Sequence, residues 1–359
     1  MNIDEFLPSI AEACRREGPQ DWIVLSSRVR LARNLKGFPF PGWAKKPERI
    51  RALEAIRPAV ESLPEMQGAF SESMDKLSSL DKQILVERHL ISREHAARSA
   101  GSGLVLNRGL TLGVMINEED HLRMQALLPG LQLRAVWQAI DALDSALESR
   151  LEYAFNRELG YLTACPTNVG TGIRASAMLH LPALVLAEQI NQVITAVNKL
   201  GLAVRGFYGE GTEALGNIFQ VSNQMTLGEA EVDIVDRLGK VVAQLSEHEE
   251  NARGSLLEKK PKVLFNHIGR AYGILANAHS ISSKETMNLL SLVRLGIDIN
   301  CFPGVSRSLV DELFMSTQPA HLQKQYSEKL SFDERDLLRA DMLRDRLATV
   351  HRPIVPPKA

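Results

Sequence analysis

The stretch IVLSSRVR at residues 23–30 joins an apolar segment to a group of arginines. Its first three residues predict a short buried strand. Arg28, Arg30 and Arg33 follow this strand directly, although arginine is ordinarily a solvated surface residue. In an extended chain Arg28 and Arg30 point to the same face, where two guanidinium forks can bind phosphate oxygens. The stretch therefore indicates a candidate phosphate site beside a buried strand.

Apolar patterns in the rest of the chain predict hairpins separated by helices. The predicted strands and hairpins lie at residues 104–116, at 161–164, around Gly206 and at 217–221. The predicted helices lie at residues 133–151, 184–199 and 229–249. This order of elements favours an α+β fold with a mainly antiparallel sheet flanked by helices.

Helical patterning continues almost without interruption from residue 263 to residue 359. Two capping boxes, at residues 282–285 and 331–334, place a serine and a glutamate where each satisfies backbone donors at a helix start. We therefore place a boundary near residue 260, with an α+β domain at 1–260 and an all-helical domain at 261–359.

The composition is that of a globular chain, because 45% of the 359 residues are hydrophobic and 24% are charged. A formal net charge of −1 argues against broad electrostatic capture of nucleic acid or of a membrane surface. No apolar run approaches the roughly 20 residues that span a bilayer, and the acidic N-terminus lacks the layout of a signal peptide. Three widely spaced cysteines, without a CxxC pair, predict no disulfide framework and no metal ligands, and fit a cytoplasmic location.

Familiar nucleotide-binding motifs are missing from the sequence. It has no GxxxxGKS or GxxxxGKT phosphate loop and no protein-kinase HRD or DFG motif. Residues 209–214 formally match GxGxxA, but they do not open a long helix after a strand, so a dinucleotide site is not expected.

Three other motifs gather arginines, carboxylates and glycines in unusual contexts. NEEDHLR occupies residues 117–123 at the end of an apolar strand, CPTNVGTGIRAS occupies 165–176, and RGFYGE occupies 205–210. Taken singly, each is most simply explained as a solvated turn or a loop.

Taken together and in this order, SSRVRLARN, NEEDHLR, CPTNVGTGIRAS and RGFYGEGTE resemble the phosphagen (guanidino) kinase family, the ATP:guanido phosphotransferases that include creatine and arginine kinases. The resemblance covers residues 20–255, which makes 1–260 the expected catalytic domain. The chain lacks the N-terminal helical domain of the metabolic enzymes. It carries instead a C-terminal helical domain with RDLLRA at residues 335–340, which is similar to bacterial protein-arginine kinases of the McsB type.

The resemblance implies that ATP and Mg²⁺ are used, and it indicates the nucleotide-binding residues. The arginines expected to hold the phosphates are Arg28, Arg30, Arg123, Arg174 and Arg205. The residues expected to complete the site are Ser26, Ser27, Val29, His89, Ala175, Ser176, Ala177, Met178, Gly206, Phe207, Tyr208, Gly209 and Glu210. His89 matches a nucleotide-contacting histidine of the family, and a histidine on a helix surface is the alternative interpretation. Met178 stands where the metabolic enzymes usually have a histidine on the adenine side.

The resemblance also implies the catalytic groups. A guanidinium has a pKa above about 12 and a delocalised lone pair, so it must be held and relieved of a proton before it can attack. Glu119 is the implied base, Glu210 the second carboxylate and Cys165 the third anchor. Nearby arginines favour the thiolate of Cys165, and an inert buried thiol is the alternative.

The RDLLRA segment is expected to form a second site, which binds phosphoarginine. Its residues are Arg335, Asp336, Leu337, Leu338, Arg339 and Ala340. Arg335 and Arg339 lie four residues apart on one helix face and can clasp a phosphate, while Asp336 can pair with a guanidinium. A charged, solvated helix face is the alternative.

The resemblance implies an ATP-dependent kinase for arginine side chains in proteins, which marks them for degradation by the Clp machinery in stress. A kinase for free arginine and a non-catalytic phosphoarginine-binding adaptor are the alternatives. The implied partners are protein substrates with exposed arginines, a zinc-binding activator protein, a Clp ATPase and further copies of this chain.

Overall fold

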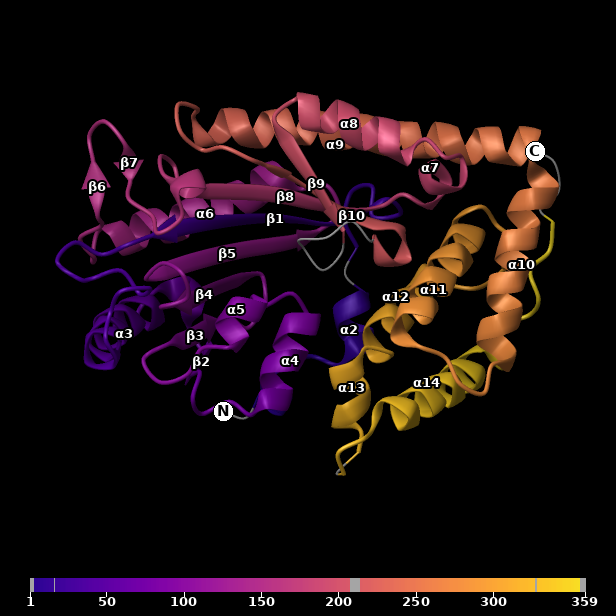
Figure 1. The fold of residues 1–359 in the computed structure, drawn as a ribbon, viewed down its shortest axis with the longest axis horizontal. Coiled ribbons are helices and arrows are strands. Elements are labelled where there is room, and N and C mark those ends of the chain that lie inside the picture. The colour runs from indigo at the N-terminus through magenta and orange to yellow at the C-terminus, as the bar shows by residue number, and fades with distance from the viewer. Residues whose placement is uncertain (1–2, 16, 207–213, 327, 356–359) are drawn as a thin grey trace.

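A computed structural model describes residues 3–15, 17–206, 214–326 and 328–355. Its centre is an eight-stranded sheet in the order β2-β3-β4-β5-β1-β8-β10-β9, in which every neighbouring pair is antiparallel (Figure 1). The strands are β1 (Val24–Arg33), β2 (Phe70–Ser73), β3 (Gly103–Leu106), β4 (Leu112–Ile116), β5 (Leu122–Pro129), β8 (Ile173–His180), β9 (Leu202–Gly206) and β10 (Ile218–Asn223). A separate hairpin pairs β6 (Phe155–Asn156) with β7 (Gly160–Tyr161). The predicted α+β fold with an antiparallel sheet is confirmed.

Strand β1 is longer than the sequence indicated, because it continues through the arginines. The sequence from residue 28 to residue 31 explains this, because arginines alternate there with apolar side chains at the two-residue period of a strand. Val29 and Leu31 are buried on one face, while Arg28 and Arg30 project from the other. The arginines thus lie within the sheet, and their backbone is fixed by hydrogen bonds to β5 and β8.

Helices cover the face to which Val29 and Leu31 point. The long helix α9 (Glu231–Lys259) and α6 (Leu133–Glu148) pack on β1, β5, β8 and β10 and share one apolar core with them (Figure 1). The helix predicted at residues 184–199 is instead two helices, α7 (Pro182–Leu186) and α8 (Ile190–Lys199). The break coincides with Glu188, which has a φ of 60° and so cannot continue an α-helix.

Smaller elements surround the sheet. Helices before β5 are α1 (Ile3–Phe6), α2 (Ile10–Cys14), α3 (Lys46–Glu61), α4 (Ser79–Glu87) and α5 (Arg93–Ala96), and the 3₁₀ turns are η1 (Pro64–Met66), η2 (Pro166–Asn168) and η3 (Leu215–Asn217). None of the described helices combines the length and apolar character that crossing a membrane requires.

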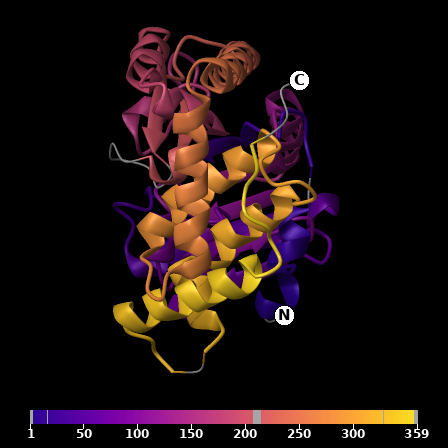
Figure 2. The same cartoon turned by 90° about the vertical axis from the view of Figure 1, so that its right-hand side faces the viewer.

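Among the described residues after 260 the regular secondary structure is helical, as predicted. The helices are α10 (Pro261–Asn277), α11 (Ser283–Asp298), α12 (Arg307–Ser316), α13 (Pro319–Lys324) and α14 (Phe332–Leu347). Ser331 and Glu334 form the complete capping box at the start of α14, and Ser282 caps α11 through the backbone N–H of Glu285. Figure 2 shows these helices gathered across one end of the sheet.

A buried ionic network joins the C-terminal helices to the rest of the molecule. Arg294 of α11 is 1% exposed; its Nε donates to Asp311 of α12 at 2.8 Å. Its two terminal nitrogens donate to the backbone carbonyls of Trp22 and Asp21, at 2.9 and 3.1 Å, just before β1. One guanidinium therefore links α11, α12 and the N-terminal edge of the central strand.

Replacing this arginine should destabilise the protein strongly. Arg294→Leu leaves two backbone carbonyls and Asp311 without their buried donor, and removing one partner of a buried pair costs about 3–5 kcal/mol. The control is Arg346→Leu, which removes a surface pair with Glu312 and should cost about 0–1 kcal/mol. Urea unfolding measures both, and similar losses in the two variants would contradict the structural role of Arg294.

Candidate active site

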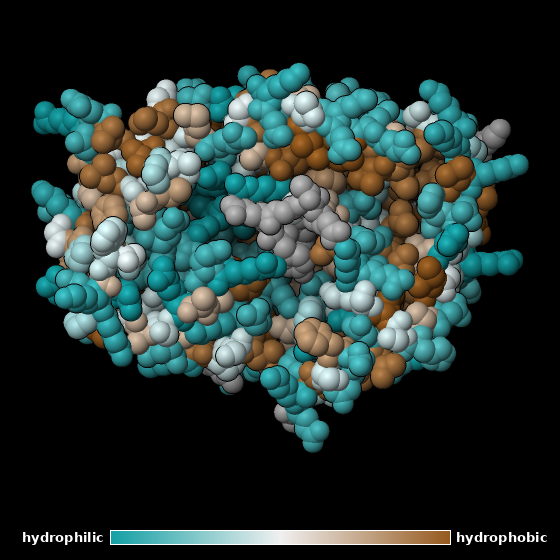
Figure 3. Space-filling model, in the orientation of Figure 1, coloured by the Kyte–Doolittle hydropathy of each residue, from teal (hydrophilic) through white to brown (hydrophobic). Residues whose placement is uncertain are grey.

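Strand pairing brings the five predicted phosphate-binding arginines to one face of the sheet. Arg30 lies directly opposite Arg174 of β8, and Arg123 of β5 lies opposite Ala32 on the same face of β1. Arg28 lies opposite Ser176, and Arg205 of β9 completes the row by pairing with Gln220 of β10. Viewed as in Figure 1, the surface here is hollowed and hydrophilic (Figure 3).

These arginines repel one another, and among the described residues only Arg123 forms an ion pair with a carboxylate. Burial, followed by the charge of Arg123, lowers the pKa of Arg28 to about 10. Burial and the charges of Arg123, Arg28 and Arg174 lower the pKa of Arg30 well below its ordinary value. The Nε atoms of Arg28 and Arg30 are buried without a hydrogen-bond acceptor. Such a surface favours a multiply charged anion that can accept several N–H bonds at once.

Arg33 does not belong to this group, although the sequence placed it beside Arg28 and Arg30. Arg33 lies an odd number of residues from Arg28 and Arg30 along β1, so its side chain points to the opposite face of the sheet. There it is 1% exposed and pairs with Asp144 of α6 at 2.5 Å. Its guanidinium also stacks on Tyr161, with 3.6 Å between the central carbon and the ring centroid. Arg33 therefore joins α6 and the β6–β7 hairpin to the sheet.

The acidic motif between β4 and β5 contains one exposed carboxylate and two buried ones. Glu118 is fully buried, accepts from Arg123 at 2.6 Å and also binds Ser92. Burial opposes its charge, but Arg123 and Ser92 outweigh burial and lower the pKa of Glu118 to about 2. Glu119 is exposed between its buried neighbours. The motif is thus not a solvated turn, and Glu119 is the one of its three carboxylates that is exposed to solvent.

Asp120 connects this motif to the Cys165 loop. One oxygen of Asp120 accepts from the backbone N–H of Ala164 and from Nδ2 of Asn34, both at 2.6 Å. Burial raises the pKa of Asp120 to about 6, despite these two bonds. The residue before Cys165 is therefore held by the same segment that exposes Glu119, and no periodic pattern in the sequence indicates this connection.

The loop after Cys165 is fixed from its other side. Thr226 donates from its hydroxyl to the carbonyl of Val169 at 2.7 Å. Gly170 has a φ of 113°, and a Cβ there would lie 2.6 Å from the carbonyl of Thr226, so only glycine fits. The Cys165 sulfur lies 3.0 Å from the hydroxyl of Thr167.

Arg174 connects the arginine row to the loop that follows Cys165, because one of its terminal nitrogens lies 3.5 Å from the side-chain oxygen of Asn168. Burial and then Arg205 lower the pKa of Arg174, while the charges of Cys165 and Glu119 act to raise it. Arg174 also donates to the carbonyl of Asn223 at 2.7 Å, which fixes its direction. Groups from three separate motifs thus lie within electrostatic reach of one arginine.

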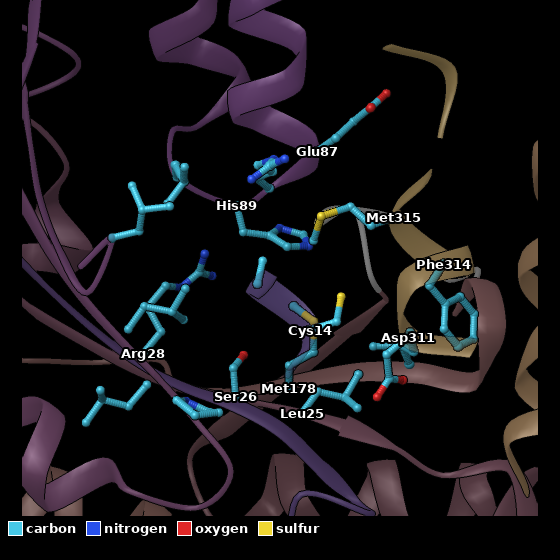
Figure 4. A pocket seen from close by; sticks show the side chains of 18 of the residues that line it. Cys14, Leu25, Ser26, Arg28, Glu87, His89, Met178, Asp311, Phe314 and Met315 are labelled. Carbon is cyan, nitrogen blue, oxygen red and sulfur yellow. The ribbon is translucent and has the colours of Figure 1, made fainter. Parts of the chain in front are cut away.

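His89 lies in the same cleft. It follows the end of α4 with a φ of 57°, and its carbonyl accepts from Gln125 of β5 at 2.9 Å. Burial, and then the charge of Arg28, lower the pKa of His89 to about 4, so the ring is neutral near pH 7. The placement beside Arg28 argues against a helix-surface role (Figure 4).

The other predicted nucleotide-site residues divide between the two faces of the sheet. Ser26, Ser176 and Met178 line a cavity next to Arg28. Those on the opposite, core-facing side are Ser27, Val29, Ala175 and Ala177, so the cleft contains none of their side chains. Ser27 instead donates to the carbonyl of Gly130 at 2.8 Å. Gly206 ends β9, whereas Phe207, Tyr208, Gly209 and Glu210 lie outside the described residues.

The RDLLRA segment lies in α14, and its two arginines differ. Arg339 is 1% exposed, and it donates to the carbonyls of Thr317 and Ile281 at 2.9 and 2.8 Å and to Asp336. Arg335 is half-buried and lies 4.7 Å over the ring of Phe332. The expected clasp by two open forks is therefore not present, because Arg339 is already engaged by backbone carbonyls. Ala340 is buried, Leu337 is exposed and Leu338 is half-buried.

Sequence models of two families match the chain. The model of the ATP:guanido phosphotransferase C-terminal catalytic domain matches residues 52–252, and that of the protein-arginine kinase McsB C-terminal domain matches residues 261–356. Among solved structures, lombricine kinase has a TM-score of 0.57 at 27% identity, with 68% of this chain and 71% of that chain covered. A substrate-free duplicated taurocyamine kinase from Schistosoma mansoni has a TM-score of 0.57 at 26% identity, with 91% and 44% covered. The fold and the site thus define a guanidino phosphotransferase.

Curated relatives narrow the class further. The protein-arginine kinase of Desulforamulus reducens is 48% identical over 333 residues, which cover 92% of this chain and 93% of the relative. That of Bacillus subtilis is 44% identical over 350 residues, which cover 97% and 96%. The chain belongs to the protein-arginine kinase family, and it is a kinase.

Two substitutions of Asp120 should separate its hydrogen bonds from its charge. Asp120→Asn retains an oxygen that can accept from both Ala164 and Asn34, so turnover well above pH 6 should stay within about threefold of wild type. Asp120→Ala releases the Cys165 loop, and displacement of a reacting group by about 1 Å can cost roughly 10²-fold. Steady-state kinetics measure both, and equal losses would contradict the tether.

A comparison of wild type with Asp120→Asn also tests the ionisation of Asp120. Its pKa rises from an ordinary 3.8 to about 6 on folding, so the folded protein binds more protons than the unfolded one in that interval. The stability of wild type relative to Asp120→Asn should therefore fall as the pH rises from 4 to 6, and stay level above it. A difference that does not change with pH would show that Asp120 titrates normally.

Proposed function

We propose that the protein transfers the γ-phosphoryl group of ATP to the guanidinium of arginine side chains in proteins. The observation that carries this proposal is the row of arginines on one sheet face, next to the exposed Glu119 and the tethered Cys165. Membership of the protein-arginine kinase family supports it. Arg28, Arg30 and Arg174 lie where they can bind phosphate oxygens along the row.

Alignment and charge neutralisation carry most of the catalysis of phosphoryl transfer. Arg30 of β1 and Arg174 of β8 are neighbours on the same face of the sheet, so both guanidinium groups can bind one phosphate group. A magnesium ion bound together with the nucleotide would help these arginines to neutralise charge that develops on the phosphates.

The acceptor arginine must lose a proton before its nitrogen attacks phosphorus. Glu119 is exposed at the cleft and can accept this proton while it orients the guanidinium. We propose that Cys165, next in the chain to the tethered Ala164, holds a second nitrogen of the acceptor guanidinium. Glu210 remains the proposed second carboxylate, and it lies outside the described residues.

A protein substrate fits the surroundings of the Cys165 loop better than a small molecule does. The β6–β7 hairpin exposes Phe155 and Leu159, and Tyr161 of this hairpin bridges to Gly170 of the loop. Figure 3 shows apolar residues on this part of the surface. An apolar border next to a charged site can bind the chain that flanks an arginine. A kinase for free arginine would gain nothing from that border.

The finer parts of the proposal extend beyond the reaction itself. We propose that the product marks proteins for the Clp machinery in stress, and that the enzyme works in the cytoplasm as a homo-oligomer with a zinc-binding activator protein. The proposed phosphoarginine site in α14 would depend on Arg335 and Asp336, since Arg339 already binds two carbonyls. These points extend the resemblance of the sequence to bacterial protein-arginine kinases.

Glu119→Gln tests the proposed base. The substitution keeps the shape of the side chain and removes its negative charge, so turnover should fall roughly 10²–10⁴-fold, as expected for a general base. ATP affinity should change little, because the phosphates bind to the arginines. Initial-rate kinetics with a protein acceptor measure turnover, and calorimetry measures ATP binding.

Glu54→Gln, at an exposed position of α3 outside the cleft, is the matched control and should behave as wild type. Near-normal turnover of Glu119→Gln would place the base on another residue and overturn this part of the proposal.

A further inference from the structure

A cavity of about 300 Å³ opens beside Arg28, at the end of the arginine row away from Glu119 (Figure 4). Leu25, Met178 and Ile218 form its floor on β1, on β8 and at the start of β10. Since Met178 lies four residues beyond Arg174 on β8, the floor continues the face that carries the arginines. The lining changes along this face from charged to apolar.

The opposite wall comes from α12 of the C-terminal helical region and from α2, which precedes β1. Phe314 and Met315 of α12 line the cavity, together with Cys14 of α2. Neither helix falls within residues 52–252, which match the phosphotransferase catalytic domain. In Figure 4, Met315 lies next to the ring of His89, and Phe314 lies at the side of the cavity away from Arg28.

This wall is held firmly in place. Phe314 packs on an apolar cluster formed by Met178, Ile218 and Met287, which joins the sheet to α11. Gln318 donates to the carbonyl of Phe314 at 2.8 Å. Asp311, one turn before Met315, is bound by Arg294, so the network that attaches the C-terminal helices also positions this side of the cavity.

We propose that α12 of the C-terminal helical region supplies one wall of the pocket for the purine base of ATP, with Met315 and Phe314 contacting the base. The inference rests on the proposed function, because it assumes that the triphosphate binds to the arginine row. A triphosphate held there and running past Arg28 brings the flat base of the nucleotide into the cavity. Thioether and aromatic side chains pack well on such a ring.

The assignment gives the C-terminal region a direct part in nucleotide binding. Met178 then faces the base from the sheet, and Met315 faces it from α12. The base then lies between two domains, so bound ATP stabilises their contact. The catalytic groups Glu119 and Cys165 do not line this cavity and are not part of the assignment.

The test compares ATP with inorganic tripolyphosphate, which carries the phosphates without a base. Met315→Ala should weaken ATP binding by about five- to twentyfold, the range expected when a partly buried side chain loses its apolar contacts. Its affinity for tripolyphosphate should stay within about twofold of wild type. Ile274→Ala, which shortens an exposed apolar side chain of α10 away from the cavity, is the matched control for both ligands.

Cys14→Phe provides a second variant, which fills the cavity from α2 instead of enlarging it and should weaken ATP binding by at least about tenfold. Wild-type ATP affinity in both variants would overturn the inference. An equal loss of tripolyphosphate affinity would also overturn it, because the wall would then act through the fold. Failure of the proposed function would give a result different from these two, because the wild-type protein would then bind ATP without transferring phosphate.

Discussion

The pairing of β1 with β8 and β5 is the constraint on which the rest of the structure depends. It places Arg30 opposite Arg174 and Arg123 on the same face, so three positive charges share a small area of sheet. A shift of one residue in this register would turn the arginines of β1 into the core and Val29 and Leu31 into the cleft. The hydrophobic face under α6 and α9 therefore fixes the position of the charged face.

Gathering like charges opposes folding, and other parts of the structure offset this cost. Apolar burial on the far side of the sheet holds the strands in register, while Glu118 neutralises Arg123 from the edge of the cleft. Arg294 attaches the C-terminal helices through backbone carbonyls just before β1. Arg28 and Arg30 remain without a carboxylate partner among the described residues, which suits a site whose ligand brings the negative charge.

Much of the fold could be predicted, because strands and helices leave periodic patterns in the sequence. The hairpin at 104–116 and the C-terminal helices follow from such patterns, and so does the grouping of Arg28 with Arg30. The tether from Asp120 to Ala164 could not be predicted, since it joins segments more than forty residues apart without a periodic signal. The opposite orientation of Arg33 required the true length of β1, and the burial of Arg339 required the packing of α14 on Thr317 and Ile281.

The central claim is that this arrangement transfers phosphate to a nitrogen of arginine within a protein. The most direct measurement incubates the enzyme with Mg²⁺, ATP and a mixture of a protein and free arginine, and then locates the phosphate by mass spectrometry at neutral pH. We expect phosphate on arginine side chains of the protein, in a bond that mild acid hydrolyses. Phosphate found only on serine, threonine or tyrosine, or only on free arginine, would contradict it.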